Sequence, residues 1–345
     1  MTSKTIDNIV WFIPSRKLRD NIRDYMNFIY NKINEINKPI RAWDRYLFIL
    51  FREDIKNDAN FYQKYLNLIK NLDKESVEIV IGILSKITNY NNIEDDIYFS
   101  HKESKRLNDL YEEFNNKIIK INEELFIYDK YILPKNQFEI EVFYDKSGMN
   151  YIKNINQVKN KNIIDAGGYI GDSAIVFSDY TDKNIYSFEP FLQNYNLMLK
   201  TIELNKKNNI IPVNMALGNE NKEISIYSNS DTANSGLSVE TKQSDINSFE
   251  NRVKMVTLDS YVKENNIEVG LIKTDLEGFE QSFLKGALET IKEQKPVLII
   301  SIYHNYSDFF EIKPMLENLN LGYKFRIIRN KSPQLITETK LLAEV

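Results

Sequence analysis

The sequence predicts an α/β protein in which a mostly parallel sheet is covered by helices on both faces. From about residue 136 onward, short apolar runs typical of buried strands alternate with segments whose apolar residues recur at helical spacing. The last two strand-like runs, 323–329 and 335–345, are joined by only a short Asn-Lys-Ser-Pro turn. Because parallel neighbours need a long crossover, we expect this pair to form an antiparallel hairpin at one edge of the sheet.

The part of the chain before the sheet is expected to be mainly helical. Apolar residues recur at intervals of three and four in the stretches 18–29, 77–87 and 107–121. We therefore divide the chain into a helical accessory domain, 1–130, and a sheet domain, 131–345.

Within the sheet domain, each strand and helix follows from its own pattern. The predicted strands are 138–144, 162–167, 184–190, 209–217, 269–275, 296–304, 323–329 and 335–345. Helices are expected to begin at Asp172 and to cover 191–202, 279–291 and 307–318. The polar stretch 228–252 lacks periodicity, and its place between two strands predicts a loop that covers a substrate.

Composition and charge exclude several classes of function. The 345 residues carry a formal net charge of −4, which argues against a nucleic-acid partner, since such proteins need a basic face. The absence of cysteine excludes disulfides, thiolate metal sites and cysteine nucleophiles. His101 and His304 are the only histidines, so a metal site would need carboxylates. His101 lies in the helical part and is expected to be a surface residue.

Membrane attachment is not the expected state of this chain. Its longest apolar runs, 46–51 and 297–302, are far shorter than the roughly 20 residues of a membrane span. No secretory cleavage site follows the first residues, so a cytoplasmic protein is expected. The segment 9–23 joins aromatic to basic residues and could touch an anionic membrane surface. We favour the alternative that the segment 9–23 is a first strand or turn that leads into a core helix.

A glycine-rich turn is the central motif. Asp165-Ala-Gly-Gly-Tyr-Ile-Gly-Asp-Ser173 joins the first buried strand to a helix, at the sheet edge where ligands bind in this class of fold. The spacing of Gly167, Gly168 and Gly171 is not the GxGxxG of dinucleotide sites, and Asp172 would repel a pyrophosphate. Acidic residues on both sides of the turn suit the cationic sulfonium of S-adenosylmethionine. Asp172 and Ser173 could also simply cap the helix.

Glu189 follows the next strand, and a carboxylate in this place can accept both hydroxyls of a ribose. This residue supports nucleoside binding and does not choose between the two cofactors.

Taken in order, these motifs resemble the FkbM family of S-adenosylmethionine-dependent methyltransferases. They are DAGGYIGDS (165–173), SFEP (187–190), NMALG (214–218), VTLD (256–259), LIKTDLEGFEQSFLKGAL (271–288) and PVLIISIYH (296–304). The resemblance spans about residues 137–340 and implies a Rossmann-like class I methyltransferase fold, with seven strands of which the last is antiparallel. It also implies O-methylation of sugar or polyketide hydroxyls, often in capsule, lipopolysaccharide or antibiotic pathways.

The resemblance also implies roles for individual residues. It places the ribose at Glu189 and the adenine near 215–217. It also places three acidic residues of the KTDLEGFE segment along the catalytic cleft: Asp275, Glu277 and Glu280. The full expected set of cofactor-binding residues is Asp165, Gly167, Gly168, Gly171, Asp172, Ser173, Glu189, Pro190, Ala216, Leu217 and Asp275.

Three residues are candidates for the base that takes a proton from the acceptor hydroxyl: His304, Asp275 and Glu277. Each follows a buried strand at the edge where ligands collect. His304 could instead be a hydrogen-bonded strand-end histidine. Asp275 and Glu277 could bind a divalent cation or cap the following helix, and we assign no metal site from the sequence.

The leading hypothesis is therefore an O-methyltransferase for a saccharide or small-molecule acceptor. An NAD-dependent oxidoreductase and a non-catalytic nucleoside-binding module are the alternatives. The helical domain could recognise the acceptor, form a homodimer or bind other biosynthetic enzymes.

Overall fold

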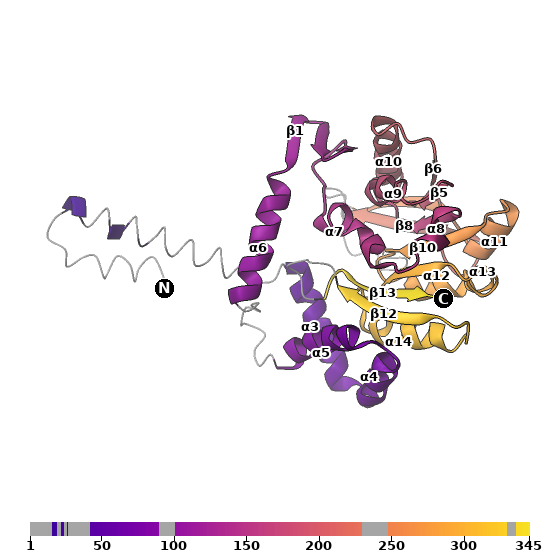
Figure 1. Ribbon diagram of the computed structural model, residues 1–345, viewed down its shortest axis with the longest axis horizontal. Helices are drawn as coiled ribbons and strands as arrows, with labels where there is room; N and C mark the ends of the chain where they lie inside the picture. The colour runs from indigo at the N-terminus through magenta and orange to yellow at the C-terminus, as the bar shows by residue number, and fades with distance from the viewer. Residues whose placement is uncertain are drawn as a thin grey trace.

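The computed structural model describes residues 16–18, 22–23, 26, 42–89, 101–229, 248–329 and 336–345. Its centre is a seven-stranded sheet of order β12-β13-β11-β10-β4-β5-β6 (Figure 1). The strands are β4 (Asn162–Ala166), β5 (Ile185–Phe188), β6 (Ile210–Val213), β10 (Val269–Thr274), β11 (Val297–Ser301), β12 (Lys324–Arg329) and β13 (Thr339–Glu344). Neighbours from β11 to β6 are parallel, whereas β13 is antiparallel to both β11 and β12. The predicted fold class and the hairpin are confirmed.

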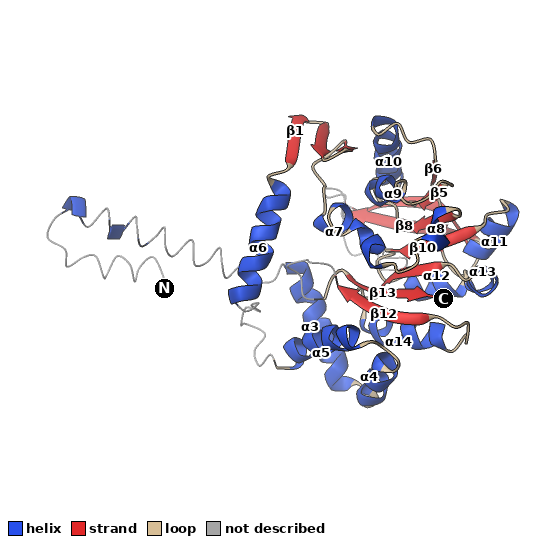
Figure 2. Cartoon of the chain, viewed as in Figure 1, coloured by secondary structure: helices blue, strands red, loops and turns tan. Residues whose placement is uncertain are grey.

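Helices cover both faces of this sheet (Figure 2). They are α7 (Ile140–Phe143), η1 (Lys146–Tyr151), α8 (Asn156–Lys159), α9 (Asp172–Phe177), α10 (Leu192–Leu204), α11 (Leu258–Glu264), α12 (Glu280–Lys285), α13 (Leu288–Gln294) and α14 (Tyr306–Glu317). Consecutive strand residues belong to different cores, because side chains alternate along a strand. Ile163 and Ile299 pack with α7 and α9, while Ile164 and Leu298 pack with α12 to α14.

The helices of the N-terminal part are α3 (Ala42–Asn57), α4 (Phe61–Ile69), α5 (Lys74–Thr88) and α6 (His101–Asn115). The predicted stripe 77–87 is helix α5, which lies beside β12 (Figure 1). There the amide of Ile327 donates to Ser76 Oγ at 2.9 Å. Helix α3 joins the core on the same face through Phe51, whose ring packs edge to face on Phe309 at 5.7 Å.

Two small sheets complete the described fold. The first, β1 (Ile118–Asn122), β2 (Leu125–Tyr128) and β3 (Tyr131–Leu133), precedes the main sheet in the chain. The second contains β7 (Ala216–Leu217), β8 (Lys222–Asn229) and β9 (Ser248–Val256) in the order β7-β9-β8. The ends of the stretch predicted as a loop, 228–252, therefore belong to strands β8 and β9, and its middle lies outside the described residues.

Two predictions about secondary structure before the main sheet were wrong. The stretch 138–144, predicted as a strand, contains the single helical turn α7. All four residues of α7 are buried, so one turn leaves no apolar period that distinguishes helix from strand. The helical stripe 107–121 ends early, because α6 stops at Asn115 and Ile118 begins strand β1. The three-residue interval between Ile118 and Ile121 imitates a helical spacing, although both residues belong to strand β1, where Ile118 pairs with Tyr128 and Ile121 lies at a register shift.

Two other predicted elements are each divided into two. The strand predicted over 209–217 is β6 followed by β7, which pairs with β9 in the second small sheet. The helix predicted over 279–291 breaks at Gly286 into α12 and α13. A Cβ at Gly286 would lie 2.0 Å from the carbonyl oxygen of Gly218, so close backbone contact requires glycine there.

No helix in the described part of the chain is long and apolar enough to cross a membrane. Most of the aromatic and basic segment 9–23, most of the stripe 18–29 and the turn between the last two strands lie outside the described residues.

Replacing Phe309 by alanine tests the packing between α3 and α14. Phe309 is fully buried, so Phe309→Ala is expected to lower the free energy of unfolding by about 3–5 kcal/mol through lost burial and a cavity. Urea denaturation of the full chain measures this loss. As a control, Tyr62→Ala removes a side chain that is 69% exposed and should cost less than about 0.5 kcal/mol. Equal stability of the two variants would contradict the proposed packing.

Candidate functional site

The glycine turn leaves the carboxyl end of β4 and leads into α9. Gly167 and Gly171 have φ angles of +82° and +83°, in the left-handed region that favours glycine. A Cβ at Gly167 would lie 2.0 Å from the carbonyl oxygen of Asp275, and one at Gly171 would lie 2.9 Å from Cγ of Met198. Close contacts within the protein therefore require glycine at both positions, whether or not a ligand also approaches the turn.

The turn also uses its own amide groups. The amides of Gly167 and Gly168 both donate to the carbonyl oxygen of Phe188, at 3.1 and 2.9 Å. The amide of Gly171 donates to Gly168, and that of Tyr169 donates to Oε2 of Glu189 at 3.0 Å. These four amides are therefore already paired within the protein.

Asp165 holds the turn to its surroundings. Its fully buried carboxylate accepts hydrogen bonds from Ser173 Oγ at 2.8 Å and Ser187 Oγ at 2.7 Å. Its other oxygen lies 3.1 Å from Nζ of Lys273, which donates to the carbonyl oxygen of Gly167 at 2.8 Å. Burial opposes the charge of Lys273, but the carboxylates of Asp165 and Asp275 raise its pKa. The predicted residues Asp165 and Ser173 thus fix the turn from inside the protein.

The sequence reasoning missed Lys273. It lies opposite Asp165 in the register of β10 and β4, and its side chain is 6% exposed. A lysine inside the otherwise apolar strand Val269–Thr274 is a signal that could have been used, since a buried charge needs a partner.

Glu189 follows β5 on the other side of the turn. It is 4% exposed, and Oε1 accepts from the amide of Phe191 at 2.9 Å while Oε2 accepts from that of Tyr169. Burial raises the pKa of Glu189 to about 8, against the opposing effect of these amides, Asn194 and Lys273. Asp172, the first residue of α9, is also buried, and burial raises its pKa to about 6.

A mostly apolar cavity lies beside the turn. Four residues predicted to bind cofactor line it: Gly167, Pro190, Ala216 and Leu217. The other lining residues are Phe188, Met215, Ile224, Met255, Leu276 and Phe279. Ile224 and Met255 were missed, because they come from β8 and β9, which border the polar stretch predicted as a loop.

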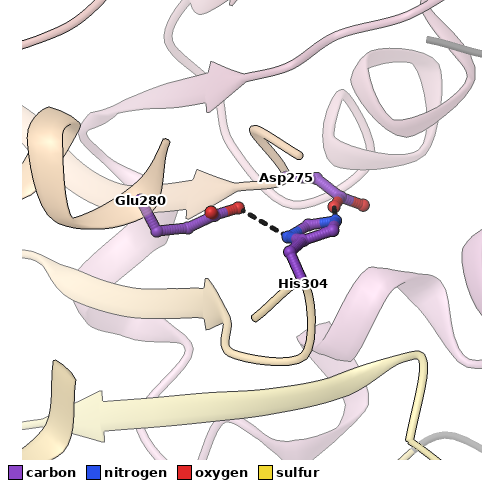
Figure 3. Close-up of side chains that lie close together, drawn as sticks. All are labelled: Asp275, Glu280 and His304. Atoms are coloured by element: carbon purple, nitrogen blue, oxygen red, sulfur yellow. Dashed lines mark ion pairs between the residues drawn. The ribbon is translucent and has the colours of Figure 1, made fainter. Parts of the chain in front are cut away.

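A histidine and several carboxylates meet where β10 and β11 end (Figure 3). Nε2 of His304 lies 3.2 Å from Oδ1 of Asp275 and 3.6 Å from Oε2 of Glu277. Nδ1 lies 3.1 Å from Oε1 of Glu280. The structure thus brings together the three candidate catalytic residues and adds Glu280 behind them.

Electrostatic effects in this cluster oppose burial. Burial would lower the pKa of His304, but Glu280 and Asp275 raise it well above its usual value. Burial would raise the pKa of Asp275, but His304, Lys273 and Lys340 lower it. Tyr303 also contributes to the site, since its hydroxyl donates to Asp275 at 3.1 Å.

The cluster and the cofactor turn are in direct contact. The amide of Asp275 donates to the carbonyl oxygen of Ala166 at 2.9 Å, and the carbonyl of Asp275 faces Gly167. Two side chains of the following loop and helix start, Leu276 and Phe279, line the apolar cavity. A ligand in the cavity and a ligand at the cluster would therefore be neighbours.

Residues 165–325 match the family model described as the methyltransferase FkbM domain. Among solved structures, the chain is similar in fold to methyltransferase FkbM from Methylobacillus flagellatus KT, with 17% identity, a TM-score of 0.55 and coverage of 85% of this chain. The match spans 60% of that protein's chain.

Two further matches have lower TM-scores. A tRNA methyltransferase of M. jannaschii has 17% identity and a TM-score of 0.35 over 65% of this chain and 57% of its own. TYW2 of M. jannaschii in complex with AdoMet has 16% identity and a TM-score of 0.32 over 66% and 87%. None of the curated proteins matches this sequence. Residues 165–325 are therefore similar to the FkbM methyltransferase domain, and the structural match shows that the chain shares the fold of such a protein.

Proposed function

We propose that the protein is an S-adenosylmethionine-dependent O-methyltransferase that acts on a sugar hydroxyl in surface-polysaccharide or related biosynthesis. The observation that carries this proposal is the direct contact between the glycine turn and Asp275. It makes the cavity beside Glu189 and the carboxylate cluster adjacent parts of one cleft. A group-transfer enzyme needs two such neighbouring sites, because holding donor and acceptor in contact supplies much of the rate enhancement.

The residues around the turn fit S-adenosylmethionine. Glu189 would hold the ribose hydroxyls, and the apolar cavity lined by Pro190, Ala216 and Leu217 would hold the adenine. Asp172, buried at the start of α9, provides negative charge suited to a cationic ligand. When bound, the cofactor supplies a methyl group activated by a sulfonium leaving group.

The same residues do not favour a dinucleotide. Phosphate groups bind at such turns through free backbone amides. Here the amides of Gly167, Gly168, Tyr169 and Gly171 all have partners within the protein. Asp172 adds a negative charge at the helix start, so we rank the oxidoreductase hypothesis lower.

On the acceptor side, we assign proton transfer to the carboxylates. The side chains of Asp275 and Glu277 are 29% and 31% exposed, so an acceptor hydroxyl can reach them and pass its proton to one of them. His304 is 3% exposed and has a carboxylate beside each ring nitrogen, so it serves as a positioning residue. Several carboxylates in one cleft also suit a polyhydroxylated acceptor, whose hydroxyl groups donate hydrogen bonds.

The remaining parts of the proposal concern location and assembly. We propose a cytoplasmic enzyme, since sugar precursors and the methyl donor are available there. We also propose that the chain divides at residue 130 into a helical domain and a sheet domain, and that two copies form a homodimer through the helical domain.

Calorimetric titration of the full chain with S-adenosylmethionine, S-adenosylhomocysteine and NAD tests the cofactor. We expect micromolar binding of the two sulfur nucleosides and no heat from NAD, because four amides of the turn already have partners within the protein and Asp172 would repel a pyrophosphate. NAD binding alone would refute the proposal.

The role of Glu189 predicts a specific dependence of cofactor affinity on pH. Hydroxyl donors favour the ionised carboxylate, and the pKa of Glu189 is about 8 in the free protein. S-adenosylhomocysteine should therefore bind more tightly as pH rises from about 6.5 to 8.5, by at most about tenfold per unit. Asp172, with a pKa of about 6, contributes to this change only at the acidic end.

The variant Glu189→Gln isolates this effect. It should bind S-adenosylhomocysteine about 10–100-fold more weakly at pH 8.5, the loss expected for hydrogen bonds to a charged group. It should also lose most of the pH dependence above pH 7. Wild-type affinity in this variant, with the same slope, would show that Glu189 does not hold the ribose.

A further inference from the structure

The imidazole of His304 has an unusual environment. It is 3% exposed, yet neither ring nitrogen makes a hydrogen bond of good geometry, although carboxylate oxygens lie 3.1 to 3.6 Å away. Buried polar atoms are nearly always satisfied in native proteins, so the two ring nitrogens call for a physical explanation. Within the described ranges, Asp275, Glu280 and His304 bring one ligand atom each to within 4.8 Å of one another.

The two sides of the ring differ. Figure 3 shows Glu280 on one side of the imidazole and Asp275 on the other. Glu280 is fully buried, and its oxygens accept from the amides of Leu276 at 2.7 Å and Gly278 at 2.9 Å. A carboxylate fixed in this way can take the Nδ1 proton of His304 as a hydrogen bond. It thereby leaves Nε2 with its lone pair, which is the arrangement that supports metal-ligating histidines.

The Nε2 side opens to the cleft. Asp275 and Glu277 place carboxylate oxygens 3.2 and 3.6 Å from Nε2, and both side chains are about one-third exposed. Glu277 has a φ angle of +53°, which is uncommon for a residue with a side chain. Such backbone strain is concentrated at functional sites, and here it accompanies a carboxylate that faces Nε2.

The two neighbouring lysines act on Asp275 through their charge, but each is in direct contact with another carboxylate. Lys273 is paired with Asp165 at 3.1 Å, and Lys340 is paired with Glu338 at 3.0 Å. Asp275, Glu277 and Glu280 therefore place three carboxylates around one imidazole.

From this geometry we propose a binding site for one divalent cation of the Mn²⁺ type, with His304 Nε2, Asp275 and Glu277 as ligands and Glu280 holding the imidazole from behind. A donor set of one imidazole and two carboxylates suits such an ion better than soft thiophilic metals. The open side of the site faces the cleft. If the proposed methyl transfer is right, the ion would hold the acceptor oxygen and lower the pKa of its hydroxyl, and the carboxylate oxygen of Asp275 or Glu277 that does not ligate the ion would take the proton.

Titration of the full chain, after treatment with a chelator, with Mn²⁺ tests the site. The electron paramagnetic resonance signal of free Mn²⁺ reports binding without any turnover. We expect one ion per chain, no binding by Asp275→Asn or His304→Ala, and about 10–100-fold weaker binding by Glu280→Gln. Glu277→Gln changes a partly exposed side chain, so it tests the site with little risk to folding.

A matched control comes from the opposite end of the same strand. Glu268 precedes β10 and is 68% exposed, so Glu268→Gln should bind Mn²⁺ as the wild type does. Circular dichroism shows whether each variant is folded, and S-adenosylhomocysteine binding does so for variants outside the expected cofactor-binding set. Wild-type protein that binds the nucleoside but no Mn²⁺ would overturn the metal site and leave the proposed function standing; the imidazole would then be a histidinium paired with its carboxylates.

The two proposals can also fail separately in the other direction. Stoichiometric Mn²⁺ binding that depends on Asp275 and His304, without nucleoside binding, would support the site and refute the proposed function. Unchanged Mn²⁺ affinity in both Asp275→Asn and Glu277→Gln would overturn the site even if the wild type binds the ion.

Discussion

The ion pair between Asp165 and Lys273 is the interaction on which the rest of the site depends. Both side chains are almost fully buried, so each charge is tolerable only because the other is present. Lys273 also holds the carbonyl of Gly167, while Asp165 accepts from Ser173 on α9 and Ser187 on β5. One pair of charges therefore connects β4, β5, β10, the turn and the following helix. A buried ion pair contributes little net stability, and its value here is that it fixes the geometry of the turn.

This fixed geometry buries two carboxyl groups in the cleft, and their burial lowers the stability of the folded protein. Glu189 and Asp172 are both buried carboxyls whose pKa values are raised by burial, to about 8 and about 6. Glu189 also accepts hydrogen bonds from two backbone amides, and strongly shifted groups that lie in a cleft favour a functional role. The cavity beside them is apolar, so the cleft presents a polar edge and an apolar floor, as a nucleoside requires.

The sequence predicted the sheet better than its surroundings, and the reason is periodicity. Buried parallel strands such as Val297–Ser301 form continuous apolar runs, and the short closing turn predicted the antiparallel hairpin. Helix α7 has four residues and strand β7 has two, so neither is long enough to show a hydrophobic period. Their secondary structure is set by tertiary packing, which the sequence pattern does not reveal. Site residues on motifs, such as Asp165 and Glu189, were named from sequence alone. Lys273 and Met255 were not, because their roles arise from cross-strand neighbours that are distant in the chain.

Strand β10 fixes the position of the carboxylate cluster relative to the glycine turn. Lys273 and Asp275 are two residues apart, so they project from the same side of the extended chain, Lys273 toward Asp165 and Asp275 toward His304. In the register of β10 and β4, Lys273 lies opposite Asp165 and Thr274 lies opposite Ala166. A shift of β10 by one residue would turn the side chains of Lys273 and Asp275 toward the apolar core on the other face of the sheet. The cost of burying two unpaired charges opposes such a shift. The same pairing that orders the turn therefore sets the position of Asp275, and the proposed donor and acceptor sites share one source of alignment.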